Sequence, residues 1–406
     1  MLKKISIHRN WVSLVCWLLL SSGLAAQNSA KDAIVKSGLL FPPKPLHTHG
    51  SSLVSLPNGD LISCWFEGSG ERQANDVKIM GTRLKKNSKE WSLPFLMADT
   101  YNLPDCNPVL FLNKNNKLFL VWIVVVANEW ENSILKVQTS TNYLADGAPV
   151  WTGGDNIFLH PDDRFEQELQ QKFKNLPKTN RGWSTYALPY DKLILSAAKD
   201  PLKRSIGWMT RIDPLVLTNG TIILPLYSDG YNLSLMAISE DDGATWKPGL
   251  PVAGRGNVQP SLVQKKNGTL VAYMRDNGDE PNRVQISESK DAGWSWTAAT
   301  KTEIPNTASV KVLKLMNGNW ALIVNDSDDG RYQLQLYLSD DEGSSWKWKY
   351  PLEQVPKGQG SFSYPAMIQT NDGFLYITYS YQTNREKGES IKYVVVNPKK
   401  ITNNAR

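Results

Sequence analysis

Four side chains of this sequence combine charge with proton-transfer chemistry: His49, Arg275, Arg331 and Tyr364. A guanidinium group binds a carboxylate through two parallel hydrogen bonds, whereas imidazole and phenol groups exchange protons with a bound molecule. Brought together, the four would form a site for an anionic ligand with proton transfer beside it. Because they lie far apart in the sequence, a regular arrangement of strands would have to supply that proximity.

A motif that recurs in the second half of the chain indicates such an arrangement. It reads Ser-x-Asp-x-Gly-x-x-Trp and ends at Trp246, Trp296 and Trp346, at a constant interval of 50 residues. An alternating segment such as 332–338 precedes each copy and predicts a strand. The Asp bonds its own turn, the Gly adopts positive φ and the Trp buries its ring between sheets. The interval predicts an array of similar β units.

A second periodic element is a tight turn of the Asn-Gly type, which typically joins two antiparallel strands. Asn116 takes the corresponding place in the second repeat, and the other turns are Asn58-Gly59, Asn219-Gly220, Asn267-Gly268, Asn317-Gly318 and Asp372-Gly373. Six turns predict six repeated units. The final strand, 391–396, would complete the unit that begins near the N-terminus and close the ring, which removes exposed edges.

In a ring of such units the innermost strands start around one central channel. Residues nine positions before the second residue of each turn should therefore face one another: Gly50, Asn107, Arg211, Gln259, Ser309 and Tyr364. Three of the six are followed by proline, which supports a common register. This polar ring is where we expect a ligand. The alternative is that its side chains only hydrate an empty axial channel.

Charge and cysteine content exclude several classes of function. The formal net charge is +6, without basic blocks. Three positive charges lie in the first 26 residues, so the rest of the chain carries about +3, which makes nucleic acid an unsuitable partner. Cys64 and Cys106 are too few for a disulfide scaffold, although an oxidising compartment would permit a bond between them. No cofactor motif is present, and we expect no cofactor.

The first 26 residues have the pattern of a signal peptide. Positive residues precede the apolar run 11–20, and small residues at 23–26 suit cleavage. The run is too short for a lasting anchor, and no later segment approaches about 18 apolar residues. We therefore expect residues 27–406 to form one exported domain, secreted or periplasmic, that is monomeric and has no membrane contact.

One insertion interrupts the periodic pattern before Trp246. Within it, Phe165, Leu169 and Phe173 recur at the spacing of one helix face. Segment 162–176 is therefore expected to form a short amphipathic helix that serves as a lid or a packing element.

The repeated motif is the Asp-box, and the chain from about Pro43 to Pro398 resembles the sialidases, or neuraminidases, with their BNR repeats. The resemblance implies an all-β fold, a six-bladed β-propeller of four-stranded antiparallel sheets. In that family the Asp-box is structural and also occurs in proteins without sialidase activity. The motif therefore specifies the fold more closely than the function.

The resemblance also implies roles for individual residues. Sialidases hold the substrate carboxylate with three arginines, use Tyr as the nucleophile with a neighbouring Glu, and use Asp as the acid/base catalyst. Tyr364 stands where the nucleophile is expected, and Arg275 and Arg331 match two of the arginines. Asp76 lies where the acid/base Asp would be.

Two positions depart from the family pattern. His49 stands in place of the first arginine, and Gln259 stands in place of the Glu that polarises the nucleophilic Tyr. A neutral amide orients a Tyr hydroxyl but does not accept its proton, so a tyrosinate nucleophile loses its base. These changes indicate an altered substrate or reaction. Asn107 and Arg211 complete the expected substrate contacts; Arg211 would either compensate for the missing arginine or pair with Asp213.

Two further alternatives stay open at this point. His47 and His49 form a His-x-His pair that could ligate a metal on one strand face, but no third ligand is evident and we expect no metal. Three carboxylates in the same region are alternatives to Asp76: Glu67, Glu71 and Asp99.

The residues favour three functions. The first is an exo-α-sialidase-type glycoside hydrolase that releases a terminal acidic sugar with retention through Tyr364, while Asp76 protonates the leaving oxygen. The second is a lyase of uronate-containing polysaccharides, in which an arginine neutralises the carboxylate and His49 or Tyr364 removes a proton. It explains His49 better than the first. The third is a non-catalytic glycan-binding propeller.

Overall fold

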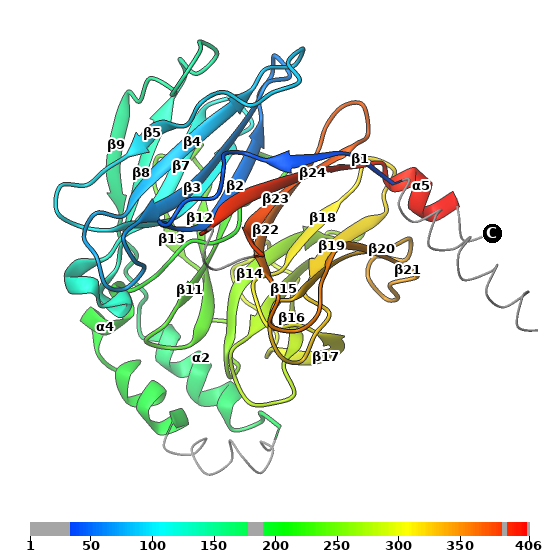
Figure 1. The fold of residues 1–406 in the computed structure, drawn as a ribbon. Coiled ribbons are helices and arrows are strands. Elements are labelled where there is room, and N and C mark those ends of the chain that lie inside the picture. The colour runs from blue at the N-terminus through cyan, green and yellow to red at the C-terminus, as the bar shows by residue number, and fades with distance from the viewer. Residues whose placement is uncertain (1–32, 178–189, 384–387, 404–406) are drawn as a thin grey trace, which may run out of the picture.

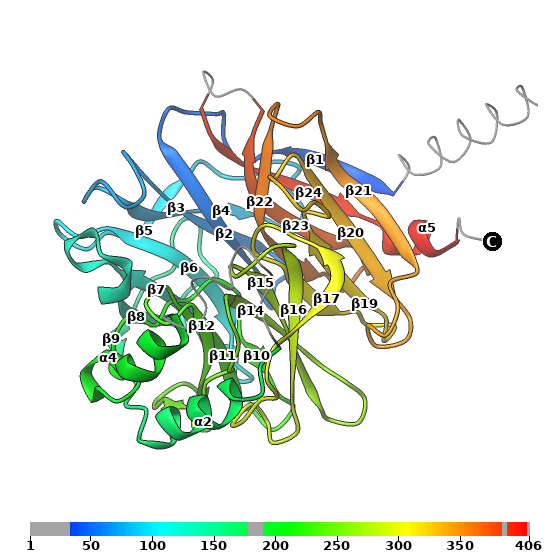
Figure 2. The ribbon, with the colours of Figure 1, turned by 90° about the horizontal axis from the view of Figure 1, so that it is seen from below.

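The strands of this protein form six four-stranded antiparallel sheets. The computed structural model describes residues 33–177, 190–383 and 388–403, so the expected signal peptide, residues 1–26, lies outside the described residues. The sheets follow one another around the molecule, and the ribbon colour changes from sheet to sheet (Figures 1 and 2). The all-β, six-bladed propeller predicted from the sequence is therefore confirmed.

Five blades take their strands in chain order, from the innermost strand outward. The first is β2 (His47–Ser55), β3 (Leu61–Gly68), β4 (Lys78–Leu84) and β5 (Phe95–Ala98). The second is β6 (Asp105–Leu112), β7 (Leu118–Val124), β8 (Ile134–Ser140) and β9 (Gly153–Ile157). The third is β10 (Leu215–Val216), β11 (Ile222–Ser228), β12 (Leu233–Ser239) and β13 (Lys247–Pro248). The fourth is β14 (Asn257–Gln264), β15 (Leu270–Asp276), β16 (Arg283–Ser289) and β17 (Thr300–Pro305), and the fifth is β18 (Lys311–Lys314), β19 (Trp320–Val324), β20 (Gln333–Ser339) and β21 (Trp348–Gln354).

The sixth blade closes the ring with strands from both ends of the described chain. β22 (Ser361–Gln369), β23 (Leu375–Gln382) and β24 (Ser390–Val396) are joined by the N-terminal strand β1 (Ile34–Leu39). β1 pairs antiparallel with β24, and Figure 1 shows blue β1 beside red β24. The prediction that the final strand meets the N-terminal segment is confirmed, with β1 as the outermost strand.

The six predicted turns each join an innermost strand to the next strand of its blade. All six place a residue in the left-handed region: Gly59 (φ 87°), Asn116 (59°), Gly220 (97°), Gly268 (90°), Gly318 (88°) and Gly373 (87°). Glycine adopts this conformation freely, and asparagine tolerates it better than other side chains. The turn residues therefore gave the correct number of blades.

The hydrophobic core lies between neighbouring blades. Val271 and Tyr273 of β15, for example, pack in one buried cluster with Trp320 and Tyr337 of the next blade. Each blade thus buries its faces against its neighbours, as layered sheets must. The inner ends of the strands around the axis are left for polar side chains.

The repeated motif forms the same hydrogen-bonded turn three times. In its second copy, Asp291 Oδ1 accepts hydrogen bonds from Ser289 Oγ at 2.8 Å and from the Ser295 N–H at 2.9 Å. Equivalent bonds surround Asp241 and Asp341. Each Asp therefore satisfies polar groups of its own turn, which is the structural role that the sequence predicted.

Trp296 fixes one of these turns to the neighbouring blade. Its side chain is 2% exposed, its Nε1 donates to Gly293 O at 3.0 Å, and it packs with Ile223 and Ile238 of the third blade. We expect Trp296→Ala to lower the free energy of unfolding by about 3–5 kcal/mol, because the lost ring leaves a cavity. Urea unfolding measures this loss. A loss below about 1 kcal/mol would contradict the assigned packing role.

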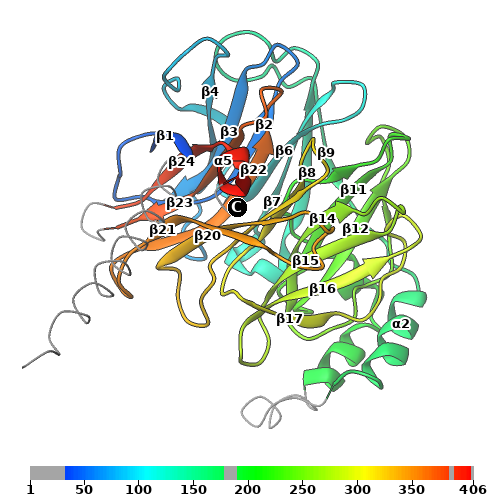
Figure 3. The same ribbon diagram turned by 90° about the vertical axis from the view of Figure 1, so that its right-hand side faces the viewer.

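The helices are few and short. α2 (Arg164–Phe173) is the amphipathic helix predicted for 162–176, and its buried residues are the three predicted ones, Phe165, Leu169 and Phe173. Figures 1 and 3 show α2 at the outer edge of the blade that contains β11 and β12. The remaining described helical segments are η1 (Val126–Asn128), η2 (Trp130–Asn132), a helical run at 190–197, α4 (Pro201–Ser205) and α5 (Pro398–Asn403).

The two cysteines beyond residue 26 are buried free thiols, Cys64 in β3 and Cys106 in β6. Burial raises the pKa of both. Within the part of the chain that the structure describes, no helix has the length and apolar character needed to cross a membrane.

Candidate functional site

Four of the six innermost strands carry the same bulge near the axis. In β2, β6, β14 and β22 the ladder to the next strand skips two residues. The first of the two always has positive φ: Gly50 (65°), Asn107 (51°), Gln259 (55°) and Tyr364 (58°). Bulges redirect side chains, and such strained backbone is typical of functional sites. The two remaining ring positions, Arg211 and Ser309, are buried in the segments before β10 and β18.

Tyr364 is the residue on which the predicted site side chains converge. Its Oη accepts hydrogen bonds from Gln259 Nε2 at 3.2 Å and from Arg275 Nη1 at 3.3 Å. The Cζ atoms of Arg211 and Arg331 lie 4.8 Å and 5.3 Å from the centroid of its ring. These side chains come from four different blades, so the propeller brings together residues that are up to 153 positions apart in the sequence.

His49 completes the group around Tyr364. The two ring centroids are 4.0 Å apart, with an interplanar angle of 50°. Burial and the nearby charge of Arg331 hold the pKa of His49 well below its usual value. The imidazole is therefore neutral at neutral pH.

The arginines also act on Tyr364 itself. Burial alone would raise the pKa of its phenol, but the positive charges of Arg275 and Arg331 outweigh that effect and lower the pKa below its usual value. A lowered pKa makes the phenolate, the nucleophilic form, more accessible.

Arg211 supplies a third guanidinium group at the axis. Its side chain is buried, and its Nη1 donates to Ser51 O at 3.2 Å. Burial lowers its pKa to about 10, so the group stays charged at neutral pH. Asp213, the alternative partner considered from the sequence, accepts a hydrogen bond from Lys311 Nζ at 2.6 Å instead.

A polar cavity of about 400 Å³ opens beside Tyr364. Asn107, Gln259 and Arg275 of the predicted set line it, and Asn107 Nδ2 donates to Oη of Tyr227, another lining residue, at 3.1 Å. Gln259 Oε1 and Arg275 Nε are buried without a hydrogen-bond partner among the described residues. Buried polar atoms are normally paired, so these atoms are left for a ligand or water, and the volume suits a sugar-sized ligand.

The acid/base candidate Asp76 is not brought to this cavity. It is exposed, and its Oδ1 accepts a hydrogen bond from the Ser69 N–H at 2.9 Å, within its own loop. Glu71 from the same loop, one of the three alternatives, lines the cavity. A second alternative, Glu67, is buried against Lys44.

His47 links Glu71 to the sixth blade. Its Nε2 lies 3.0 Å from Glu71 Oε2, and its Nδ1 lies 3.2 Å from Glu389 Oε2. Burial on its own would lower the pKa of His47, but the two carboxylates raise it to about 9. Among the described residues, no three His, Cys, Asp or Glu side chains are grouped so as to hold a metal ion.

The pKa of His47 predicts a pH dependence of stability. Because the folded-state pKa, about 9, exceeds the usual 6.5, the imidazolium stabilises the fold fully below pH 6.5. That contribution, at most about 3 kcal/mol, is lost as the pH rises through about 9. We expect His47→Gln to flatten the unfolding free energy between these limits, measured in urea, whereas a substitution of the exposed His160 should not. An unchanged pH profile in His47→Gln would contradict the assignment.

Several cavity residues were not predicted from the sequence. Arg72 packs its guanidinium 4.2 Å from the ring centroid of Trp130 and pairs with Asp229 at 2.6 Å. Tyr227 could have been predicted from the sequence, because it stands seven residues after the turn glycine of its blade, as Arg275 does in the next blade. Others, such as Asp229 and Asn277, lie in segments between strands that differ from blade to blade, so periodicity carried no information about them.

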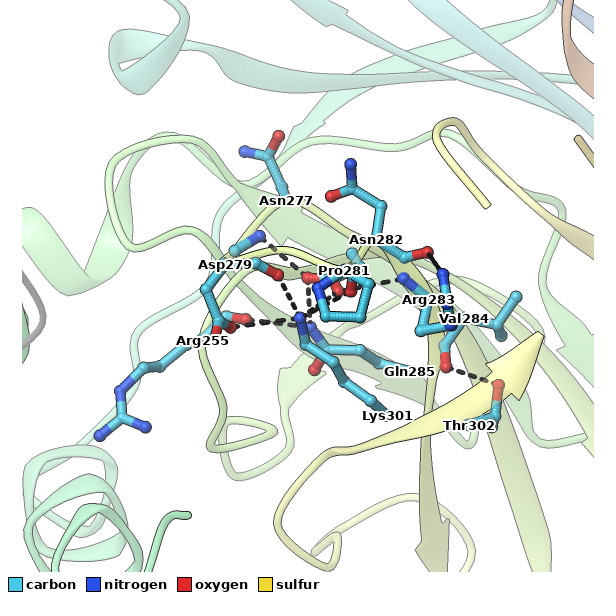
Figure 4. A network of polar contacts seen from close by, with 12 residues as sticks. Arg255, Asn277, Asp279, Pro281, Asn282, Arg283, Val284, Gln285, Lys301 and Thr302 are labelled. Atoms are coloured by element: carbon cyan, nitrogen blue, oxygen red, sulfur yellow. Dashed lines mark hydrogen bonds and ion pairs between the residues drawn. The ribbon is translucent and has the colours of Figure 1, made fainter. Parts of the chain in front are cut away.

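Asn277, on the loop that follows β15, forms another part of the cavity wall. Its Nδ2 donates to Asn232 Oδ1 at 2.8 Å. Figure 4 shows Lys301 at the centre of the polar network that holds this loop. Lys301 Nζ contacts Asp276 Oδ2 at 2.8 Å, Asp279 Oδ1 at 3.2 Å and Pro281 O at 3.0 Å. The ammonium group of Lys301 thus joins three points of this loop, and backbone hydrogen bonds such as Asn277 N–H to Gly256 O add to it.

The repeated motif lies at the opposite end of the blades from the cavity. Cavity residues Tyr227 and Arg275 lie at the ends of β11 and β15, whereas the motif turns follow β12, β16 and β20. Successive antiparallel strands end on opposite sides of a sheet. The three tryptophans therefore serve the fold and not the site.

Comparison with known proteins agrees with this architecture. Residues 59–161 and 181–377 match the family model of the BNR repeat-like domain. A sialidase from Clostridium perfringens is 24% identical over 318 residues, which cover 70% of this chain and 77% of the relative. A sialidase from Paraclostridium sordellii is 29% identical over 145 residues, 31% of this chain, and the match spans only 35% of that relative.

Solved structures show the same fold. The intramolecular trans-sialidase from Ruminococcus gnavus, in complex with oseltamivir carboxylate, is similar with a TM-score of 0.63 at 14% identity, over 91% of this chain and 99% of that one. The matched family model covers well over half of the sequence. This chain therefore belongs to the BNR repeat-like domain family, with the propeller fold of the sialidases that it resembles.

Proposed function

We propose that this protein is a glycoside hydrolase of the exo-α-sialidase type that removes a terminal acidic sugar from a glycan. The observation that carries the proposal is Tyr364, held at the axis among the guanidinium groups of Arg211, Arg275 and Arg331 beside a polar cavity. Guanidinium groups bind the carboxylate of such a sugar, and the tyrosine oxygen is the nucleophile nearest to them.

The reaction would proceed in two displacements at the anomeric carbon. Tyr364 Oη forms a bond to that carbon as the bond to the leaving oxygen breaks, and the leaving oxygen takes a proton. A water molecule then attacks the same carbon, Tyr364 departs and the water proton returns to the acid/base group. Two inversions give net retention.

We assign the proton donor to the pair formed by Glu71 and His47. Glu71 lines the cavity, whereas Asp76, the residue expected from the family pattern, bonds within its own loop. Because the pKa of His47 is raised to about 9, the pair carries a proton at neutral pH. Asp76, which the sequence predicted as the proton donor, has no part in this assignment.

A lyase acting on uronate-containing glycans is the second candidate. The favouring observation is that Tyr364 Oη contacts an amide and a guanidinium group, while neutral His49 lies against its ring. In that reaction His49 or Tyr364 removes the proton on the carbon next to the carboxylate. The electron pair forms a carbon–carbon double bond as the leaving oxygen departs.

A screen of the purified protein against sialosides and uronate glycans separates these functions. The hydrolase proposal predicts free acidic sugar without new ultraviolet absorbance. A conjugated, unsaturated product would reject the hydrolase and support the lyase. Binding without turnover of any glycan would leave a glycan-binding propeller.

Export is a separate part of the proposal. The pattern of residues 1–26 supports a cleaved signal peptide and a secreted or periplasmic protein. Mass spectrometry of protein recovered from outside the cytoplasm should find an N-terminus near residue 27. A chain that keeps Met1 and stays in the cytoplasm would contradict it.

A further inference from the structure

We infer that Tyr364 reacts as a phenolate that no protein base prepares: its proton passes to solvent water, and Gln259 and the arginines hold the anion. Hydrogen bonds at its oxygen are the first ground. Both come from N–H groups, one of Gln259 and one of Arg275, and arginine has no acceptor. Among the described residues, none accepts a hydrogen bond from the Tyr364 hydroxyl. A neutral phenol would find no protein acceptor for its O–H among these residues, whereas a phenolate uses both donors.

The charges around the ring are the second ground. Arg211 from the segment before β10 and Arg331 from the segment before β20 face the ring, and Arg275 of β15 faces the oxygen. His49 of β2 adds no charge, because its lowered pKa keeps the imidazole neutral. One phenolate among three guanidinium groups still leaves the site positive, so the anion and a substrate carboxylate are both accommodated.

The negative charge that opposes ionisation of Tyr364 most strongly is Glu71, from the loop after β3, and Asp229, which pairs with Arg72, lines the same cavity. The Glu71 carboxylate is engaged by His47 at 3.0 Å, whose imidazolium offsets it. The balance of these groups lowers the pKa of Tyr364 despite its burial. Positive groups therefore outweigh negative ones at this oxygen.

Tyr227 of β11 provides an internal comparison. Its hydroxyl accepts a hydrogen bond from Asn107 Nδ2 at 3.1 Å, and it lines the same cavity. Burial raises its pKa, in contrast to that of Tyr364. Each tyrosine oxygen accepts a hydrogen bond from a side-chain amide, but Arg275 and Arg331 act on Tyr364, whereas the carboxylate of Asp229 is the main charge that acts on Tyr227.

The phenolate explains why a glutamine, and not a glutamate, suits position 259. A carboxylate at this position would share the phenol proton and place a negative charge beside the oxygen, which favours the neutral phenol. An amide donates to the anion and adds no charge. Gln259 is thus the positioning residue that makes the phenolate the working form. This role deepens the proposed function at the same site, but its test needs no substrate.

The test is a titration of phenolate absorbance in the purified protein, with no glycan present. We expect one tyrosine to ionise at lower pH than the others, and this step to be missing in Tyr364→Phe but kept in Tyr227→Phe. Gln259→Glu should move the step upward by at least about one pH unit. NMR of the unmodified protein with carbon-13-labelled tyrosine rings also shows whether one tyrosine ionises at lower pH than the others. This measurement does not depend on the stability of the variants.

Three results would overturn the inference: no early step, an early step that survives in Tyr364→Phe, or a step that Gln259→Glu leaves in place. The outcome is distinguishable from failure of the proposed function. An early Tyr364 titration without turnover of any glycan would sustain the phenolate and reject the hydrolase. Turnover of a glycan without the early titration would sustain the hydrolase and reject the phenolate.

Discussion

Tyr364→Phe should lower the turnover of an acidic glycan by at least about 100-fold, the lower range of what a positioned proton-transfer or nucleophilic group contributes. The substitution removes one oxygen and keeps the ring. Contacts of the ring with His49, Arg211 and Arg331 are retained, so packing and melting temperature should change little. Steady-state kinetics on a confirmed substrate and thermal unfolding measure the two effects.

The matched control for this variant is Tyr376→Phe. Tyr376 lies on β23 of the same blade, paired with Ile368 near the turn at 370–373, at the far end of the sheet from Tyr364. It should keep full turnover. Full turnover in Tyr364→Phe itself would remove Tyr364 from the chemistry and leave the propeller with a misplaced site.

Arg275→Ala should weaken binding of acidic glycans by about 1.5–3 kcal/mol, on the order of 10- to 100-fold in affinity, through loss of a charge-assisted, bidentate contact. Arg275 lines the cavity, and its Nε has no partner among the described residues. The guanidinium is therefore available to a carboxylate. Calorimetry with an acidic glycan and its uncharged ester measures the loss, which should be confined to the acidic form.

A control for the charge change is Arg283→Ala in the same blade. Arg283 pairs with Asp328 outside the cavity, so its loss should leave affinity for acidic glycans intact. Equal losses in the two variants, or an equal loss for the ester, would show that Arg275 acts through general electrostatics and not by contact with a carboxylate.

The parts of the fold that were readable from sequence are those fixed by local chemistry. A glycine or asparagine with positive φ marks each inner turn, and counting back from it gave the bulge residues Asn107, Gln259 and Tyr364. The count works because the interval between the axial residue and the turn residue is nine positions in each of these blades. The pairing of β1 with β24 followed from the need to close the ring.

The parts that were not readable depend on loops and on contacts between blades. The loop after β3 offered several carboxylates, and only its fold places Glu71, and not Asp76, at the cavity. His47 read as half of a metal pair, yet it lies between Glu71 and Glu389, which are 318 residues apart in sequence. The sequence also left open whether Arg211 pairs with Asp213. In the structure Asp213 accepts a hydrogen bond from Lys311 instead. No local pattern encodes such contacts.

The most direct test of the central claim, retaining hydrolysis through Tyr364, is the anomeric configuration of the first-formed product. Proton NMR spectra recorded during turnover of a confirmed acidic glycoside distinguish the two anomers before they equilibrate in water. Two displacements at one carbon predict that the free sugar appears first with the configuration of the substrate. Initial release of the opposite anomer, or of an unsaturated sugar, would contradict the account.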